Sequence, residues 1–389
     1  MTNLRLKALL GATALTMLAA GAAQAGGFSR GTADTDILFE EGNFNLRTGV
    51  TIVNPSRKYT SNPSAPHLVG TDPFETYVIP SAAVKFKIFD NLNCAGTYTQ
   101  PFGGSGAWEF PGTLTGKVKE EFVVNEFGAT CGVNFDMGKG RLWVLGGVFA
   151  ENFDYERANV TLLGPIDLTL NGTDVGYRVG LAYDITEIAL RAQVMYRSGT
   201  SYGADGTLTG PAGVLAPALP IPPATQISVP VLGIGEVPQS VEMKLQSGIA
   251  PGWLAYGSVK WTDWSVNKTL DVVRTNGAII SRNEYYWKDG WTVTGGVAHS
   301  FTDRIAGTVS LTWDRGVGTG YDHSSDTYTL GVGGSFKDQW GGELRAGVGL
   351  SYLTSAEETK YPSPYNPALN SAVDSGWATA VTASYKVKW

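Results

Sequence analysis

Residues 377–389, with the sequence WATAVTASYKVKW, alternate strictly between two kinds of side chain. Trp377, Tyr385 and Trp389 belong to an apolar face with an aromatic ring at each end, and Lys386 and Lys388 belong to a face of small or cationic side chains. Because successive side chains of a strand point to opposite faces, this period of two predicts a β-strand. A strand between lipid and a polar lumen, with aromatic rings at both membrane interfaces, has this pattern. An edge strand of a soluble protein also fits, so the rest of the chain has to decide.

The N-terminus is organised like a secretory signal peptide. Arg5 and Lys7 precede an apolar run at residues 8–20, and Ala23-Gln24-Ala25 forms an A-x-A cleavage site. The apolar run is too short and too rich in alanine for a membrane-spanning helix. We therefore predict that residues 1–25 are removed and that the mature chain begins at Gly26. No later segment has eighteen consecutive apolar residues, so any residence in a membrane requires strands.

Composition supports an ordered, exported β protein. The chain has 50 glycines, 11 tryptophans and 17 tyrosines among 389 residues, and only 16% of its residues are charged. This aromatic content argues against disorder. The formal net charge of −6 and the absence of a basic cluster argue against nucleic-acid binding.

The connections between strand-like segments alternate in length. We place about fourteen such segments, joined in turn by short and long connectors. Short periplasmic turns that alternate with long extracellular loops, over an even number of antiparallel strands, are typical of an outer-membrane β-barrel. A propeller or β-helix would instead show a fixed repeat. The long connectors are predicted at residues 54–77, 103–119, 154–172, 199–238, 267–283, 316–325 and 355–374.

Several cations fall on the polar faces of these strands, which we assign to the lumen. They are candidates to bind a carboxylate, because a guanidinium can hold one with two hydrogen bonds. The alternative is that they form salt bridges with lumen acids such as Asp174, Glu121 and Glu343. The candidate cations are Arg47, Arg178, Arg191, Lys260 and Arg345.

The stretch CAGTYTQPFGG, residues 94–104, interrupts the strand pattern. Pro101 cannot donate a ladder hydrogen bond and glycine weakens pairing, so the stretch predicts a bend or local gap in the barrel wall. The alternative is that Pro101 only ends the strand at the outer rim. Cys94 and Cys131 lie near the periplasmic ends of adjacent predicted strands, where a disulfide is feasible because the periplasm is oxidising. Such a disulfide would staple the wall beside the gap.

The chain resembles the FadL family of outer-membrane transporters of long-chain fatty acids and related hydrophobic compounds. Gly26-Gly27-Phe28 resembles the start of that family's N-terminal hatch, and Gln100-Pro101-Phe102-Gly103 resembles the P-F-G of its third strand. Trp261-Thr262-Asp263-Trp264-Ser265, followed by Trp287-Lys288-Asp289-Gly290-Trp291, is similar to its W-t-x-W-S and W-K-D-x-W motifs. The likeness covers nearly the whole mature chain.

The resemblance implies a monomeric barrel of fourteen strands, formed by residues 43–389 and closed by an N-terminal plug at residues 26–42. It also implies capture of ligand among the extracellular loops, passage to an internal pocket, and lateral exit at the third strand, near Pro101, Phe102 and Gly103. Transport would be passive. The plug is shorter than usual and lacks an N-P-A element before the first strand, which puts details of the family's gating in doubt.

Three groups of apolar residues are candidates to bind ligand. Phe28 matches the family's N-terminal Phe that occupies the pocket, with packing of the plug as the alternative. Leu38 and Phe39 are further plug candidates. The predicted loop at residues 199–238 is rich in apolar residues and is either a groove of first contact or a cap that buries itself. Its candidate residues are Leu215, Leu219 and Ile221.

Nothing in the sequence predicts an enzyme, a metal site or a cofactor. His67, His299 and His323 lack metal-ligand spacing. His323 beside Asp322 could suggest an outer-membrane protease or phospholipase, but no constellation of a nucleophile and carboxylates supports that class. We therefore predict an all-β outer-membrane barrel that passively takes up hydrophobic molecules, with long-chain fatty acids first; the alternative is a diffusion porin for small hydrophilic solutes. The expected partners are the ligand, outer-membrane lipid and, through the strand that ends at Trp389, the barrel-assembly machinery.

Overall fold

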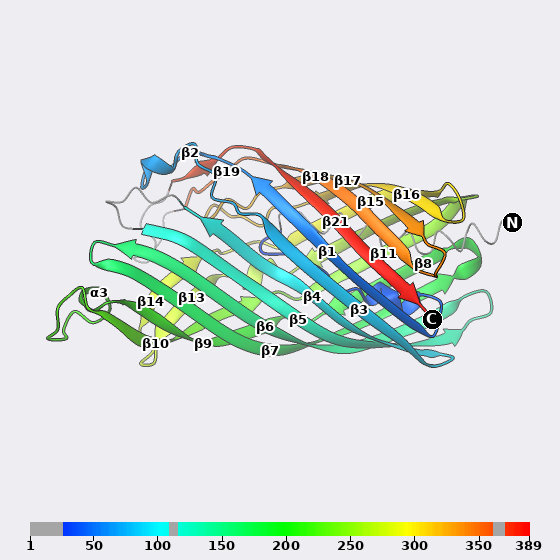
Figure 1. Cartoon of the computed structure of the whole chain (residues 1–389), viewed down its shortest axis with the longest axis horizontal. Coiled ribbons are helices and arrows are strands. Elements are labelled where there is room, and N and C mark those ends of the chain that lie inside the picture. The colour runs from blue at the N-terminus through cyan, green and yellow to red at the C-terminus, as the bar shows by residue number, and fades with distance from the viewer. Residues whose placement is uncertain (1–25, 109–115, 361–369) are drawn as a thin grey trace.

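The computed structural model describes residues 26–108, 116–360 and 370–389. In this part of the chain the predicted fold class is confirmed: the strands form one closed antiparallel barrel with 14 crossings (Figure 1). The uninterrupted crossings are β1 (Phe44–Ser56), β3 (Tyr77–Phe89), β4 (Leu92–Ala107), β5 (Gly116–Asp136), β6 (Arg141–Thr161), β7 (Gly164–Ile185), β16 (Ile305–Asp314), β17 (Thr327–Lys337), β18 (Glu343–Leu353) and β21 (Gly376–Lys388).

Four consecutive crossings are each made of two strands with a break between them. They are β8 (Leu190–Arg197) with β9 (Thr200–Pro211), β10 (Gln226–Val237) with β11 (Ser240–Ala250), β12 (Trp253–Thr262) with β13 (Thr269–Arg274), and β14 (Ile279–Glu284) with β15 (Gly290–Ser300). The two strands of one broken crossing pair with the two strands of the next: β8 pairs with β11 and β9 with β10, and likewise β12 pairs with β15 and β13 with β14.

The C-terminal strand closes the barrel. β21 pairs with β1 from Asn45↔Lys388 to Ser56↔Trp377, and β1 pairs on its other side with β3. The side chains of β21 alternate as predicted: Val381 is 56% exposed on the outer face, whereas the neighbouring Thr382 is buried in the lumen. Because each described crossing pairs with a neighbour on both sides over at least part of its length, the sheet closes on itself and has no terminal strand in lipid. Among the described residues, no helix is both long and apolar enough to span a membrane.

The prediction of long extracellular loops is wrong at three places. β6 and β7 continue as a hairpin joined only by residues 162–163, β9 and β10 are joined through the short helix α3 (Ala212–Leu215), and β13 pairs with β14. These hairpins extend from the end of the barrel that lies at the left of Figure 1. Beyond the membrane both faces of a ladder meet water or other loops, so apolar and polar residues need not alternate there. Backbone pairing between the two arms stabilises these segments without such a pattern.

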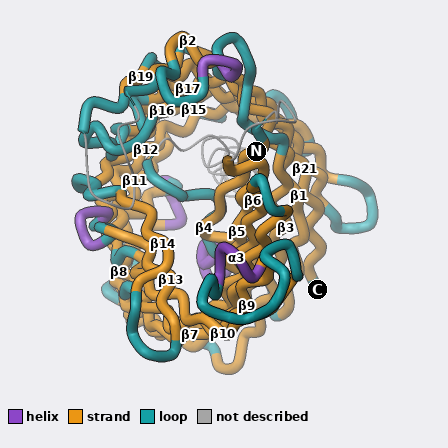
Figure 2. The backbone as a smooth tube through the Cα atoms, turned by 90° about the vertical axis from the view of Figure 1, so that its left-hand side faces the viewer, coloured by secondary structure: helices purple, strands orange, loops and turns teal. Residues whose placement is uncertain are grey.

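Short elements lie at both ends of the barrel. A small sheet of β2 (Tyr59–Ser61), β19 (Ala356–Glu357) and β20 (Ala372–Val373) lies at the extracellular end, near the 3-10 helix η3 (Pro66–Leu68). The 3-10 helices η4 (Thr186–Ile188) and η5 (Trp264–Val266) follow β7 and β12. Figure 2, along the barrel axis, shows the closed ring of strands.

Residues 26–42 lie inside the barrel as a plug, whose 3-10 helix η2 (Thr35–Phe39) occupies the end with the short turns. Ile37 and Leu38 of η2 are fully buried against Trp143 and Leu145 of β6. The ammonium of Lys85 on β3 donates to the carbonyls of Glu40 and Gly42, at 2.6 and 2.7 Å. Apolar packing and hydrogen bonds therefore both hold this end of the plug against the wall.

Candidate ligand cavity and wall seam

The two tryptophan-rich motifs lie at breaks between paired strands. Trp264 begins η5, between β12 and β13, and Trp287 lies between β14 and β15. Both side chains are almost fully buried in the lumen, and their ring centroids are 5.1 Å apart. The breaks free these residues from the alternation of a regular strand, so both rings can turn towards the same interior space.

Phe28 of the plug completes an aromatic cluster with these tryptophans. Its ring centroid lies 4.6 Å from Phe122, 4.7 Å from Trp287, 5.4 Å from Tyr285 and 6.2 Å from Trp264. Three of the four contacts are edge-to-face, an arrangement that aromatic rings prefer. The cluster joins the first described residues of the chain to Trp264, Tyr285 and Trp287, more than 200 residues away in sequence.

An interior cavity of about 760 Å³ surrounds this cluster. Its volume lies within the roughly 300–1,000 Å³ of small-molecule sites. Its apolar wall includes Phe28, Phe102, Phe122, Phe153, Trp264 and Trp287. Charged side chains also line it, among them Arg30, Arg57, Glu120 and Arg157. The cavity can therefore accept an apolar molecule and still offer partners to a polar head group.

The wall beside the cavity has a seam between β3 and β4. These strands pair from Lys87↔Asn93 to Ser81↔Thr99, and there the ladder stops. Continuing the same register would place Pro80 opposite Gln100, next to Pro101, and neither proline has an N–H to donate. On its other side β4 bulges, because Gln100 and Pro101 together oppose one residue of β5. β4 continues to Ala107, so Pro101 does not end the strand at the outer rim.

The plug occupies the seam in the place that β3 leaves. The amides of Arg30 and Gly31 donate to the carbonyls of Pro101 and Gln100, both at 2.8 Å, and the amide of Gly103 donates to the carbonyl of Phe28 at 2.9 Å. Gly31 lies between the strands, since a Cβ there would be 3.0 Å from both Ile79 and the carbonyl of Gln100. Only glycine fits this approach without displacing the wall. Residues 28–31, called the seam segment below, thus act as a short strand on the free edge of β4.

The side chain of Arg30 lies at the same seam. Its guanidinium carbon is 4.2 Å from the centroid of the Tyr77 ring, and a Cβ on Gly103 would come within 2.6 Å of it. Arg30 is only 4% exposed and lines the cavity. Its contact with Tyr77 joins the plug to β3 across the seam, while the backbone of the seam segment joins the plug to β4.

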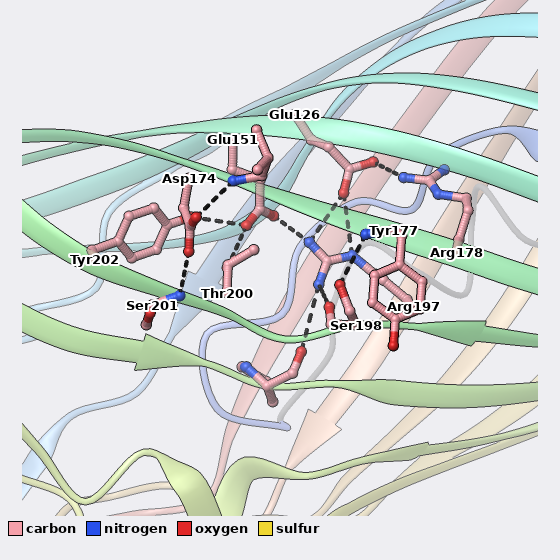
Figure 3. Close-up of polar contacts among 12 residues, drawn as sticks. Glu126, Glu151, Asp174, Tyr177, Arg178, Arg197, Ser198, Thr200, Ser201 and Tyr202 are labelled. Atoms are coloured by element: carbon pink, nitrogen blue, oxygen red, sulfur yellow. Dashed lines mark hydrogen bonds and ion pairs between the residues drawn. The ribbon is translucent and has the colours of Figure 1, made fainter.

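A network of charged residues lies beside the cavity on β5 to β9 (Figure 3). Glu126 accepts from Arg178 and, at 3.1 Å, from Arg197, whose guanidinium also bonds Glu151. Tyr202, which lines the cavity, donates to Glu151 at 2.9 Å. Both glutamates are at most 2% exposed. We call these five residues the lumen network. Removing buried charges from water is costly unless they are paired, and here each carboxylate has a cationic partner.

The cations predicted from the sequence mostly have acidic partners in the structure, and none of them lines the cavity. Arg47 pairs with Asp34 and Glu40 of the plug, and Arg345 bonds Glu343 at 2.8 Å. Arg178 belongs to the lumen network, and Arg191 lies 3.8 Å from Asp36. The predicted pairing with Glu343 is therefore present, whereas Asp174 instead accepts from the amide of Ser201. Lys260 faces Glu242 across the β11–β12 ladder, with no ion pair within 4 Å among the described residues.

The apolar residues predicted from the sequence to bind ligand lie in three different places. Phe28, Phe102 and Gly103 line the cavity. Leu38 and Phe39 pack at the periplasmic end of the plug, against Trp143. In the hairpin of β9 and β10, Leu215 is buried in the main apolar core, whereas Leu219 and Ile221 are 48% and 38% exposed. The segment predicted as one apolar loop therefore contains both a buried anchor and an exposed tip.

Cys94 of β4 and Cys131 of β5 are directly opposite each other and form a disulfide. It joins the two strands on the side of β4 that faces away from the seam.

A buried polar cluster lies among the extracellular loops. The hydroxyl of Ser371 donates to Glu358 at 2.7 Å and lies 3.0 Å from Nε2 of His323. Burial raises the pKa of Glu358 to about 7 and that of Asp322 to about 6, and burial lowers the pKa of His323 to about 4. The Trp287 indole donates to Asp322, which connects this cluster to the aromatic cluster of the cavity.

Sequence reasoning missed three residues of the seam. Arg30 is a single cation in a polar stretch and Tyr77 ends a predicted loop, so neither stands out in the sequence. Pro80 lies inside a strand, where a central proline is unusual. A second strand proline, in the strand before the P-F-G motif, was the available signal.

Comparisons with known proteins agree with this geometry. The family model described as outer membrane protein transport protein (OMPP1/FadL/TodX) matches residues 19–324. The crystal structure of a Pseudomonas aeruginosa FadL homologue aligns with a TM-score of 0.73 at 12% identity, over 96% of this chain and 98% of that chain. The Pseudomonas putida toluene transporter TodX aligns with a TM-score of 0.63 at 13% identity, over 96% and 98% of the two chains. A comparison with curated protein sequences finds no match.

At such low identity the structural likeness establishes the fold alone, whereas the family model covers well over half of the chain. Its members are outer-membrane transporters of hydrophobic compounds. The chain therefore belongs to the FadL/TodX family of outer-membrane transport proteins.

Proposed function

We propose that this barrel takes up long-chain fatty acids by passive diffusion and releases them sideways into the outer membrane through the seam between β3 and β4. After removal of the signal peptide, residues 26–42 act as its plug. The ligand enters from the extracellular hairpins, occupies the cavity around Phe28, and leaves when the seam segment moves off β4. No catalytic step is needed, since the concentration gradient of the ligand drives transport.

The observation that carries the proposal is the position of the seam beside the cavity. Gly103 and Phe28 belong to both, because they line the cavity and share a backbone hydrogen bond across the seam. An apolar molecule that leaves here meets lipid without first entering water, which the hydrophobic effect favours.

The axial route is less favourable for such a molecule. The lumen network lies beside the cavity, and η2 with its buried Ile37 and Leu38 fills the periplasmic end. An apolar ligand that took this route would separate paired charges and displace the packed side chains of η2, and both changes cost free energy. Lateral exit avoids both costs.

The alternative function, diffusion of small hydrophilic solutes, requires an open water-filled lumen. The plug and the lumen network argue against it. Recordings from planar bilayers separate the two functions: we expect almost no ion conductance from the intact chain, and the steady open conductance of a porin would exclude a sealed plug.

A variant with a repaired seam tests lateral exit. Deleting Pro101 removes the bulge and Pro80→Val restores an N–H to β3, so that β3 and β4 can pair along the seam. We expect this variant to fold and bind palmitate, but to lose uptake of radiolabelled palmitate into cells that lack other transporters of this family. Pro230→Val is the matched control, because it replaces a strand proline far from the seam, opposite Thr207 in the β9–β10 hairpin. Unchanged uptake by the repaired variant would exclude the lateral route.

A further inference from the structure

Within the part of the chain that the structure describes, Arg30 differs from three buried arginines of the lumen wall in having no carboxylate partner. Arg47, Arg178 and Arg345 each bond at least one carboxylate. Among the described residues Arg30 has no acidic partner within ion-pair distance; Glu121 attracts it from farther away, but Glu121 itself pairs with Lys119 at 3.0 Å. The neighbour that Arg30 does have is the face of the Tyr77 ring, at 4.2 Å.

A buried cation of this kind is incompletely compensated. A cation–π contact contributes about 0.5–2 kcal/mol, whereas a carboxylate that accepts two N–H groups of a guanidinium forms a stronger, charge-assisted pair. Arg30 lines the cavity, so an anion inside the cavity can reach it without crossing the wall.

The backbone of Arg30 also belongs to the seam segment, through its hydrogen bond to Pro101. If the Arg30 side chain exchanges Tyr77 for another partner, the position of the seam segment is therefore affected directly. The contact with Tyr77 holds the plug to β3, so loss of that contact weakens the attachment of the seam segment on the β3 side, while its hydrogen bonds to β4 remain.

We propose that Arg30 is the residue by which this transporter distinguishes hydrophobic carboxylates from neutral hydrophobic molecules of the same length. The carboxylate of a bound ligand replaces Tyr77 as the partner of the guanidinium, and this exchange releases the seam segment. A neutral ligand occupies the same apolar cavity but leaves the Arg30–Tyr77 contact intact, so the seam stays filled. This inference rests on the proposed function and assigns its ligand selectivity to one side chain.

Amide hydrogen exchange of the seam tests the proposal on the mature full-length chain in detergent. The amides of Arg30, Gly31 and Gly103 are hydrogen-bonded across the seam, so their exchange reports its opening. We compare palmitate with hexadecanol at pH 8, where the carboxylate is ionised. Palmitate should accelerate exchange of these amides by about twofold to thirtyfold, the range that corresponds to the loss of one cation–π contact, and hexadecanol should leave it unchanged.

Arg30→Gln should remove the difference between the two ligands while both still quench the fluorescence of Trp264 and Trp287 on binding, if brominated forms are used. Lys58→Gln is the matched control, because it removes a positive charge from an exposed extracellular position outside the cavity. This control should keep the palmitate response.

Two results would overturn the role of Arg30: equal acceleration by hexadecanol and palmitate in the unmodified chain, or a full palmitate response in Arg30→Gln. In both cases binding and uptake of palmitate would persist, so the proposed function would stand. Failure of the unmodified chain to bind or take up palmitate would instead reject the proposed function itself.

Discussion

Replacing Phe28 by alanine should strengthen ligand binding. Phe28 projects from the plug into the cavity and contacts four aromatic rings. If a ligand occupies the same space, it has to displace this ring, and the free energy of that displacement weakens the apparent affinity. Phe28→Ala removes most of this competition because alanine cannot fill the site.

The size of the effect follows from the packing. Truncation of a fully buried phenylalanine to alanine costs about 3–5 kcal/mol. Phe28 is only partly buried, so we take about 2–3 kcal/mol as the free energy that a ligand has to spend to displace its ring from the cavity. At 1.4 kcal/mol per tenfold, the apparent Kd should fall by about 30-fold to 150-fold.

Titration with brominated palmitate measures this change, since Trp264 and Trp287 lie beside Phe28 and bromine quenches their fluorescence on contact. Phe28→Leu, which retains part of the packing, should give an intermediate Kd. Phe135→Ala, which truncates an exposed ring on the outer face of β5, should leave the Kd unchanged. A weaker affinity in Phe28→Ala would refute the reasoning, because it would mean that the Phe28 ring contacts the bound ligand and does not have to be displaced by it.

Three further predictions concern stability. Burial raises the pKa of Glu358 to about 7, above the value near 4.5 in the unfolded chain, so the contribution of Glu358 to stability declines as the pH rises from 4.5 to about 7. Between pH 4.5 and pH 8, the unfolding free energy of Glu358→Gln in urea titrations should therefore rise by about 1–3 kcal/mol relative to that of the unmodified chain. A difference between the two chains that does not change with pH would contradict this. Replacing Cys94 and Cys131 by serine should lower the unfolding free energy by about 3–4 kcal/mol, given their sequence separation of 37, and a reductant should reproduce this shift only in the unmodified chain. Glu126→Ala leaves the buried Arg178 and the half-buried Arg197 of the lumen network without this carboxylate and should cost about 3–5 kcal/mol. An unchanged urea midpoint would show that the network is solvated.

The membrane crossings could be predicted because their signal is local. A strand between lipid and lumen has to alternate at every second residue, and residues 377–389 show this pattern without reference to any partner strand. The cost of a charge in lipid likewise assigns Arg47 and Arg345 to the lumen from their position in the strand alone. The signal is lost beyond the membrane, which is why the hairpins of β6–β7 and β9–β10 were predicted as loops.

The candidate site could be predicted only in part. Phe28, and Phe102 and Gly103 of the P-F-G motif, do line the cavity, and their roles in binding and exit stay predictions. The roles of the lumen cations depend on which acid lies opposite, and that acid comes from the plug for Arg47 and from another strand for Arg178. No spacing within one strand contains this information.

By itself, then, the sequence determined the number of crossings, the face that each presents to lipid, and the family, because each depends on residues close together in the chain. Only the tertiary structure decided which residues of β3 and β4 are left unpaired and which plug residues occupy that place. Pro80 and Pro101 become neighbours through the register of β3 and β4, and Arg30 meets Tyr77 only once the plug has entered the closed barrel. The strand register and the position of the plug both depend on many contacts between segments that are distant in the sequence. No local sequence pattern contains that information.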